Sequence, residues 1–158
     1  MAPGAPTPSD ISRARRQQRR ATQPTQADLD LLDDQSFLGI EIRFSSIPGA
    51  GQGAFATREL AMHTVLGQYK GEVLTLTEVA ARYPDGASRA YLMDVGSGRW
   101  HDCIDPAQSN WLRYINSPHN TGRAPNARLE INGVIKTVQR VLPGQELLYS
   151  YGRTYSFA

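Results

Sequence analysis

The sequence has almost no cysteine. Its 158 residues contain one, Cys103, which excludes an internal disulfide and a zinc site built from cysteines. A lone cysteine can be a nucleophile, but no histidine and asparagine pattern in the chain marks Cys103 for that role. We therefore expect Cys103 to be a small buried residue, and we expect no metal site.

Long apolar runs are missing as well. No run approaches the ~20 residues that a helix needs to cross a bilayer, and the start of the chain lacks the apolar region of a signal peptide. The net charge is only +2, so the chain as a whole does not indicate nucleic-acid binding. These features predict a soluble, intracellular protein with no membrane partner.

Aromatic residues are absent from residues 1–36, and all thirteen lie at or after Phe37. A segment of this composition buries too little apolar surface to offset its ordering entropy, so we predict a disordered tail over 1–36 and one domain over 37–158. Residues 13–20 hold five arginines and are a candidate nucleic-acid-binding or nuclear-import segment, with a solvated arm as the alternative. A brief helix within 27–37 would lead into the domain.

From Phe37 onward the patterns are those of short strands and turns. Residues 37–44 alternate apolar and polar side chains, and glycines interrupt a strand pattern over 64–74. Thr75 and Glu78 fit a capping box for a short helix, and Asp105 with Pro106 opens another that we expect to reach Tyr114. Two strands flank the turn at 96–98, and Asn132-Gly133 predicts a β-hairpin over 127–141. The fold class is therefore mainly β with two short helices.

The glycine-rich stretch 48–56 superficially resembles a dinucleotide fingerprint. That fingerprint needs a long helix after it and a ribose-binding acid about twenty residues on, and neither fits here. What remains is a backbone that a ligand can approach closely, because glycine has no Cβ in the way.

Four motifs in this order resemble those of the SET domain, the protein-lysine methyltransferase fold. The family pattern is Gly-x-Gly with a nearby Phe, Tyr-x-Gly-Glu, Arg-Phe-Ile-Asn followed by Pro-Asn, and Gly-Glu-Glu-Leu ending in Tyr-Asp-Tyr-Gly. Residues 110–116 and 146–152 also resemble the PR branch of the family. The resemblance covers roughly residues 37–155 and rests on Gly51-Gln52-Gly53 with Phe55, Tyr69-Lys70-Gly71-Glu72, Arg113-Tyr114-Ile115-Asn116 with Pro125-Asn126, and Gly144-Gln145-Glu146-Leu147 with Tyr149-Ser150-Tyr151-Gly152.

This resemblance implies a β-clip-like fold of small sheets with a C-terminal pseudoknot, in which Asn126 would lock the loop. It also implies S-adenosyl-L-methionine as cofactor and the lysine of a protein, above all a histone tail, as substrate. Tyr151 and Tyr69 would be catalytic, and Tyr91 and Tyr155 are candidates for the wall of the substrate channel. The cofactor pocket would be lined by Tyr151 and by Gly51, Gln52, Gly53, Arg113, Asn116 and Ser117. No general-base carboxylate is expected, since Glu72 and Glu146 would bond within strands and turns.

The chain departs from the family pattern in three places. Ser117 replaces the histidine after the asparagine, and the spacing from Asn116 to Pro125-Asn126 is four residues longer than usual, which we expect to bulge at the surface. No cysteine cluster follows Gly152, so the lysine channel would be closed by the last residues, by the N-terminal arm or by a second subunit in a homodimer.

Two other functions stay open from the sequence. One is a methyltransferase for a non-histone protein. The other is a catalytically idle SET module that binds protein or nucleic acid through residues 1–36. The basic arm is compatible with nuclear import, so a eukaryotic source would place the protein in the nucleus.

Overall fold

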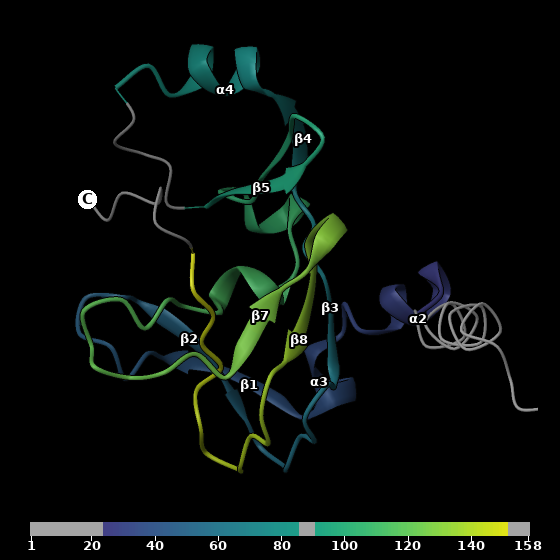
Figure 1. The fold of residues 1–158 in the computed structure, drawn as a ribbon, viewed down its shortest axis with the longest axis vertical. Helices are drawn as coiled ribbons and strands as arrows, with labels where there is room; N and C mark the ends of the chain where they lie inside the picture. Colours follow the sequence, from purple (N-terminus) through teal and green to yellow (C-terminus); the bar gives the residue numbers. More distant parts are fainter. Residues whose placement is uncertain (1–23, 86–90, 152–158) are drawn as a thin grey trace, which may run out of the picture.

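The fold is a set of small sheets joined by short helices (Figure 1). A computed structural model describes residues 24–85 and 91–151, so the predictions for residues 1–23 and for Tyr155 lie outside the described residues. In chain order the elements are α2 Gln26–Leu31, α3 Gln35–Leu38, β1 Ile40–Phe44, β2 Gln52–Ala56, β3 Val65–Gln68, β4 Glu72–Thr75, α4 Leu76–Arg82, β5 Leu92–Gly96, β6 Arg99–Asp102, η1 Pro106–Gln108, η2 Trp111–Tyr114, β7 Ala127–Leu129, η3 Ile131–Gly133 and β8 Val134–Thr137.

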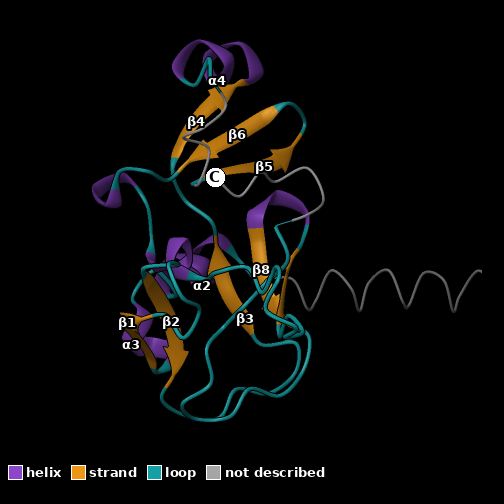
Figure 2. Cartoon of the chain, turned by 90° about the vertical axis from the view of Figure 1, so that its left-hand side faces the viewer, coloured by secondary structure: helices purple, strands orange, loops and turns teal. Residues whose placement is uncertain are grey.

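The strands form three antiparallel sheets, ordered β1-β2, β3-β8-β7 and β4-β6-β5. The sheet of β4, β6 and β5 lies with α4 at one end of the molecule, and the other two sheets lie at the other end (Figure 2). The larger core cluster joins the β1-β2 and β3-β8-β7 sheets, whereas a small separate cluster fills the space under α4. The predicted mainly β fold of small sheets is confirmed.

Local turn chemistry accounts for most of the predicted elements. The Thr75 hydroxyl accepts from the Glu78 amide and the Glu78 carboxylate accepts from the Thr75 amide, so α4 has the predicted capping box. The β5–β6 turn passes through three residues with positive φ, as its Gly-Ser-Gly sequence suggests. Asn132 has φ 65° in the β7–β8 hairpin, where a short 3₁₀ turn takes the place of a two-residue loop.

The predicted helix from Asp105 to Tyr114 is interrupted. Asp105 does accept from the Ala107 amide, but the chain forms two 3₁₀ turns, η1 and η2, separated by extended backbone at Ser109 and Asn110. The Asn110 side chain donates to the Gln68 carbonyl at 2.7 Å and to the Asp33 carboxylate at 2.9 Å. These long-range bonds replace the next helical turn, and a sequence window does not reveal them.

The packed region begins before the predicted boundary at Phe37. Leu29 on α2 and Leu32 just after it are buried in the main core, and the Trp111 indole donates to the Leu32 carbonyl at 2.8 Å. Lys70 pairs with Asp30 at 3.0 Å and with Asp33. Asp30 and Asp33 thus flank an apolar face, and the described residues 24–36 pack with the domain.

Two leucines on α2 test this packing. We expect Leu29→Ala to lower the free energy of unfolding by about 2–4 kcal/mol, because it opens a cavity in the core. Leu31 is 59% exposed on the same helix, so Leu31→Ala is the matched control and should change stability by less than ~0.5 kcal/mol. Urea unfolding measures both, and equal effects would show that α2 does not pack on the domain.

The C-terminal segment runs between the two ends of the loop 116–126. On one side the Tyr149 amide donates to the Asn116 carbonyl at 3.0 Å, and on the other the Asn126 and Ala127 amides donate to the Leu148 carbonyl, each at 3.0 Å. Parallel bridges pair Leu148 with Asn116 and Tyr149 with Ala127. This is the arrangement expected of the C-terminal pseudoknot.

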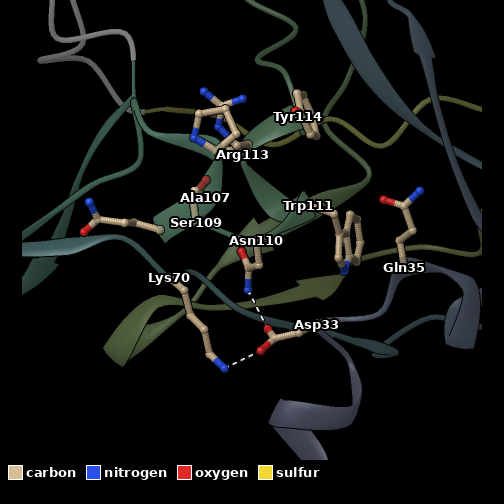
Figure 3. A pocket seen from close by; sticks show the side chains of 11 residues that line it. Asp33, Gln35, Lys70, Ala107, Ser109, Asn110, Trp111, Arg113 and Tyr114 are labelled. Carbon is tan, nitrogen blue, oxygen red and sulfur yellow. Dashed lines mark hydrogen bonds and ion pairs between the residues drawn. The ribbon is translucent and has the colours of Figure 1, made fainter.

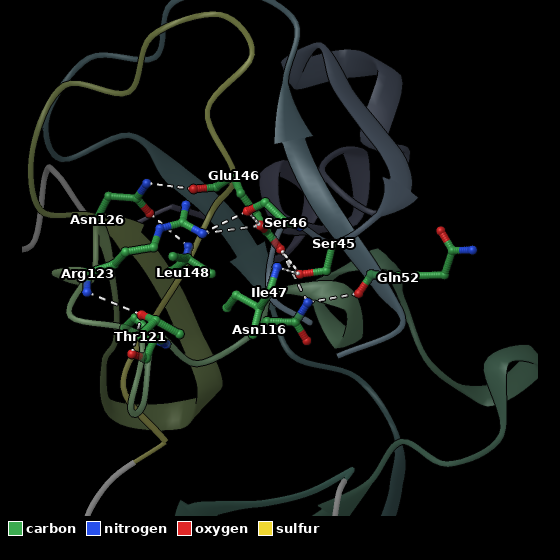
Figure 4. A network of polar contacts seen from close by, with 11 residues as sticks. Ser45, Ser46, Ile47, Gln52, Asn116, Thr121, Arg123, Asn126, Glu146 and Leu148 are labelled. Carbon is green, nitrogen blue, oxygen red and sulfur yellow. Dashed lines mark hydrogen bonds and ion pairs between the residues drawn. The ribbon is translucent and has the colours of Figure 1, made fainter. Parts of the chain in front are cut away.

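Asn126 locks this arrangement, as the sequence predicted. Its side chain accepts from the Leu148 amide at 2.8 Å and donates to the Glu146 carbonyl at 2.8 Å (Figure 4). It is 7% exposed and supplies the bonds that a neighbouring strand would otherwise make.

Changing Asn126→Asp replaces the amide donor with a carboxylate oxygen facing the Glu146 carbonyl. We expect this variant to lose about 2–4 kcal/mol of stability, since a buried donor is lost and a charge is buried without a partner. The exposed Asn120, which has φ 58°, provides the matched control, because aspartate also tolerates that conformation. Thermal unfolding should separate the two variants, and similar midpoints would contradict the locking role.

Candidate functional site

The glycine turn between β1 and β2 leaves its backbone open. Gly51 has φ 73°, and a Cβ built there would have no heavy atom within 4 Å. The turn is closed by the Ser45 amide, which donates to the Gly51 carbonyl at 2.8 Å, and Gln52 is exposed at the start of β2. A ligand can therefore approach this main chain closely.

Asn116 ties the glycine turn to the pseudoknot. Its side-chain amide donates to the Gln52 carbonyl at 2.8 Å and to the Glu146 carboxylate at 3.3 Å. Its own carbonyl accepts from the Tyr149 amide. Ser117, the next residue, is half-buried beside it.

Tyr151 is held by the neighbour of Asn116. The Tyr151 hydroxyl donates to the Ile115 carbonyl at 2.9 Å, and its ring lies 4.9 Å from that of Tyr149, centroid to centroid. Ile115 therefore holds the Tyr151 hydroxyl, and Asn116, the next residue, holds the Gln52 carbonyl. Hydrogen bonds at residues 115 and 116 thus link the glycine turn, Asn116 and Tyr151.

Tyr69 is a neighbour of Tyr151, but it is deeply buried. Its side chain is 4% exposed, and burial holds the pKa of its hydroxyl well above the ordinary value, so it stays a neutral phenol. The electrostatic neighbours of Tyr69 include Tyr149, Tyr151 and Cys103, and the Cys103 thiol donates to the Lys70 carbonyl at 2.9 Å. Burial also raises the pKa of the Cys103 thiol to about 12, which makes it a poor nucleophile at neutral pH.

Among the described residues, the hydrogen bonds and cation–π contacts of the Arg113 side chain are with residues 91, 103, 104 and 114 and not with the glycine turn. Its guanidinium donates to the carbonyls of Cys103 at 2.9 Å and Ile104 at 3.0 Å, and lies 4.3 Å from the ring centre of Tyr91. Arg113 is 9% exposed, so its charge is buried among these groups. Tyr91, a predicted wall of the channel, is half-buried beneath it, and Tyr155 lies outside the described residues.

Glu146 is the centre of a buried polar network next to the glycine turn (Figure 4). Its carboxylate accepts from the Ser45 hydroxyl at 2.6 Å, from the Ser46 amide at 3.0 Å and from the Ser46 hydroxyl. Burial pushes the pKa of Glu146 up, but hydrogen bonds from Ser45, Ser46 and Asn116 outweigh that effect and leave the pKa below its ordinary value. The carboxylate is therefore ionised at neutral pH, and it serves structure, as predicted.

Three members of this network were missed in the sequence. Ser45 and Ser46 follow a strand and look like ordinary turn residues, and Arg123 lies in the loop that was expected to bulge at the surface. Arg123 instead donates to the Ser46 hydroxyl at 2.7 Å and lies 3.6 Å from the Glu146 carboxylate. No sequence signal reveals this return of the loop to the site.

A cavity of about 420 Å³ lies elsewhere, between the α2–α3 segment and the two 3₁₀ turns (Figure 3). Two buried polar atoms near it, Ser109 Oγ and Asn110 Oδ1, have no hydrogen-bond partner among the residues described. None of the predicted glycines, Asn116 or Tyr151 lines this cavity, so the convergence around Asn116 defines the candidate site. The lining residues are Asp33, Gln35, Lys70, Pro106, Ala107, Gln108, Ser109, Asn110, Trp111, Arg113 and Tyr114.

Comparison with known proteins identifies the family. Residues 40–158 match the family model for the PR domain of PR domain zinc finger protein 2. The chain belongs to the PR-domain branch of the SET-domain family. The confirmed resemblance extends over both the glycine turn and the pseudoknot.

Two relatives show the range of this PR-domain family. Over 117 residues the chain is 35% identical to histone-lysine N-methyltransferase set-17 of Caenorhabditis elegans, which covers 72% of this chain and 41% of the relative. Over 126 residues it is 32% identical to histone-lysine N-methyltransferase PRDM16 of Mus musculus, which covers 68% of this chain and 10% of the relative. This PR domain therefore spans less than half of either relative.

Within the described part of the chain, no group of three or more histidine, cysteine, aspartate or glutamate side chains could hold a metal ion. No helix in residues 24–85 and 91–151 is long and apolar enough to span a bilayer.

Gly53 tests the coupling between the glycine turn and Glu146. A Cβ at Gly53 would lie 2.3 Å from the Glu146 carboxylate oxygen, so we expect Gly53→Ala to lower stability by about 2 kcal/mol. In a Glu146→Ala background the same change should have less than half that effect, because the nearest obstructing group is gone and only the milder contact with the Ser45 Cα, at 3.1 Å, remains. A double-mutant cycle by urea unfolding measures this, and additive effects would mean that the two groups are not in contact.

Proposed function

We propose that this chain is an S-adenosyl-L-methionine-dependent protein-lysine N-methyltransferase. The observation that carries the proposal is the double attachment at residues 115 and 116. Asn116 holds the open glycine turn by its Gln52 carbonyl, and Ile115 holds the Tyr151 hydroxyl. A donor bound at the turn and an amine steered by Tyr151 would then meet at one place.

The residues at the turn suit the cofactor. Open main chain at Gly51 and the exposed Gln52 would offer polar backbone to the donor. Asn116 bonds to the Gln52 carbonyl, and Ser117, the residue after it, is proposed to contact the donor as well. Gly53 contributes differently, because its missing Cβ makes room for Glu146. The buried Arg113 guanidinium bonds to the carbonyls of Cys103 and Ile104 and lies over the Tyr91 ring, so in this proposal it supports the tyrosines of the lysine channel.

When bound, S-adenosyl-L-methionine supplies a methyl group on a sulfonium cation for in-line displacement by an amine. The chain then has to align the two reactants, and alignment alone can supply several kcal/mol of barrier reduction. A protonated lysine, with a pKa of ~10.4 in water, has no lone pair to react. Both groups favour the neutral amine: the tyrosines exclude water, and the buried cation of Arg113 near Tyr69 repels positive charge.

Tyr151 has the central role in this proposal. The Tyr151 hydroxyl donates its proton in a hydrogen bond to the Ile115 carbonyl. The lone pairs of the phenol oxygen are then left to accept a hydrogen bond from an incoming amine. Tyr69 would support it from the buried side as a neutral phenol, and Tyr91 and Tyr155 remain proposed walls of the lysine channel.

The substrate that we propose is a lysine in a histone tail, because both named relatives are histone-lysine N-methyltransferases. A nuclear location follows from that substrate, and residues 13–20 are proposed as the import or nucleic-acid-binding segment. The last residues of the chain, the N-terminal arm or a second copy of the chain in a homodimer would close the lysine channel.

A second candidate function is a catalytically idle module that binds protein or nucleic acid. The burial of Tyr69 favours it, because a phenol that is 4% exposed has little room to meet a substrate. Residues 1–36 would then carry binding. A salt-sensitive DNA gel shift that is lost on deleting residues 1–23, which leaves the packed Leu29 and Leu32 in place, would support this function. A non-histone protein substrate is the third alternative and is tested by the same methylation assay.

Radiolabelled methyl transfer to histones and to a lysine-peptide array tests the enzyme. We expect transfer by the wild-type chain and a loss of about tenfold to a hundredfold in kcat for Tyr151→Phe, with cofactor affinity by calorimetry unchanged. Tyr83→Phe is the matched control. Tyr83 belongs to the other core cluster and donates to Asp102, so we expect this substitution to affect stability only. Cofactor binding without transfer to any lysine peptide would favour the idle module.

A further inference from the structure

The loop 117–126 is longer than the family pattern, yet it folds back onto the molecule. The Thr121 hydroxyl donates to the Pro118 carbonyl at 2.6 Å and accepts from the Arg123 amide at 3.2 Å. This small internal turn directs Arg123 toward the chain segment before the glycine turn (Figure 4). There Arg123 donates to the Ser46 hydroxyl at 2.7 Å.

The group that Arg123 reaches is a buried negative charge. The Glu146 side chain is fully buried, and a buried carboxylate is stable only when hydrogen bonds or an opposite charge compensate its lost hydration. Ser45, Ser46 and Asn116 supply the hydrogen bonds. Among the described residues, Arg123 is the cation within 4 Å of this carboxylate.

The Ser45–Ser46 segment is continuous with the glycine turn. The Ser45 amide donates to the Gly51 carbonyl, and the Ile47 amide donates to the Ser45 hydroxyl at 3.0 Å. Whatever fixes Ser46 therefore fixes the start of the turn, while Glu146 fixes its far end through contact with Gly53.

We propose that Arg123 is a positioning residue that clamps the Ser45–Gly53 segment in its donor-binding shape, which makes the long loop part of the cofactor site. The expected effect of the clamp on cofactor affinity rests on the proposed function. The clamp itself does not, because it is formed by residues of the chain without cofactor. Arg123 is 40% exposed at its side chain, so solvent can compete for it, and the turn is held reversibly.

Hydrogen exchange on the full chain without cofactor tests the clamp directly. In Arg123→Ala we expect the amides of residues 45–53 to exchange about threefold to tenfold faster, because one charge-assisted hydrogen bond that opposes local opening is removed. Arg128→Ala is the matched control, since Arg128 is 66% exposed and pairs with Glu130 far from the turn. Arg123→Lys should recover part of the protection, because it keeps the charge without the guanidinium geometry.

Calorimetry and kinetics give the second readout. We expect the cofactor dissociation constant of Arg123→Ala to rise about threefold to tenfold, with kcat at saturating cofactor within about twofold of wild type. Unchanged exchange at 45–53 relative to Arg128→Ala, or faster exchange spread evenly over the whole domain, would overturn the clamp. If the wild-type chain binds no cofactor, the proposed function fails, while the exchange comparison still decides whether the clamp exists.

Discussion

The passage of residues 146–149 between Asn116 and Asn126 is the constraint on which the rest of the structure depends. Threaded backbone is rare because it restricts the chain heavily. Here the Asn116 carbonyl at one end of the loop accepts from the segment, and the Asn126 and Ala127 amides at the other end donate to it. The same segment carries Glu146 inward to the glycine turn and Tyr151 onward to the Ile115 carbonyl. One short stretch thus locks the fold and also sets the relative positions of the two halves of the candidate site.

Two buried charged side chains, those of Glu146 and Arg113, lie in or near this segment. The Glu146 carboxylate is ionised because serine hydroxyls, a backbone amide and Asn116 compensate for its burial, and it organises chain on three sides. Arg113 plays a comparable part across the pseudoknot, where two carbonyls and the Tyr91 ring surround its guanidinium. Breaking either centre would leave an uncompensated charge, which is far more damaging than the loss of one surface ion pair.

Local chemistry made much of the fold predictable. The Thr75 capping box, the glycines of the β5–β6 turn and Asn132 each act within a few residues, so the sequence shows them directly. The break between η1 and η2 was not predictable, because Asn110 bonds to Asp33, 77 positions away. Leu29 and Leu32 were hidden for a related reason: their partners lie across the core, while the aspartates beside them dominate the local composition.

Some residues of the candidate site were likewise predictable from the sequence, and others were not. The motifs gave the glycine turn, Asn116 and Tyr151, whereas the roles of Ser46 and Arg123 arise only when a long loop returns to the core. We propose that donor and amine meet beside Asn116. A crystal structure with S-adenosylhomocysteine and a lysine peptide would decide this, and we expect the sulfur near the Gly51 main chain and the lysine nitrogen near the Tyr151 hydroxyl. Cofactor bound in the cavity beneath α2, or on the far side of the molecule from Tyr151, would contradict it.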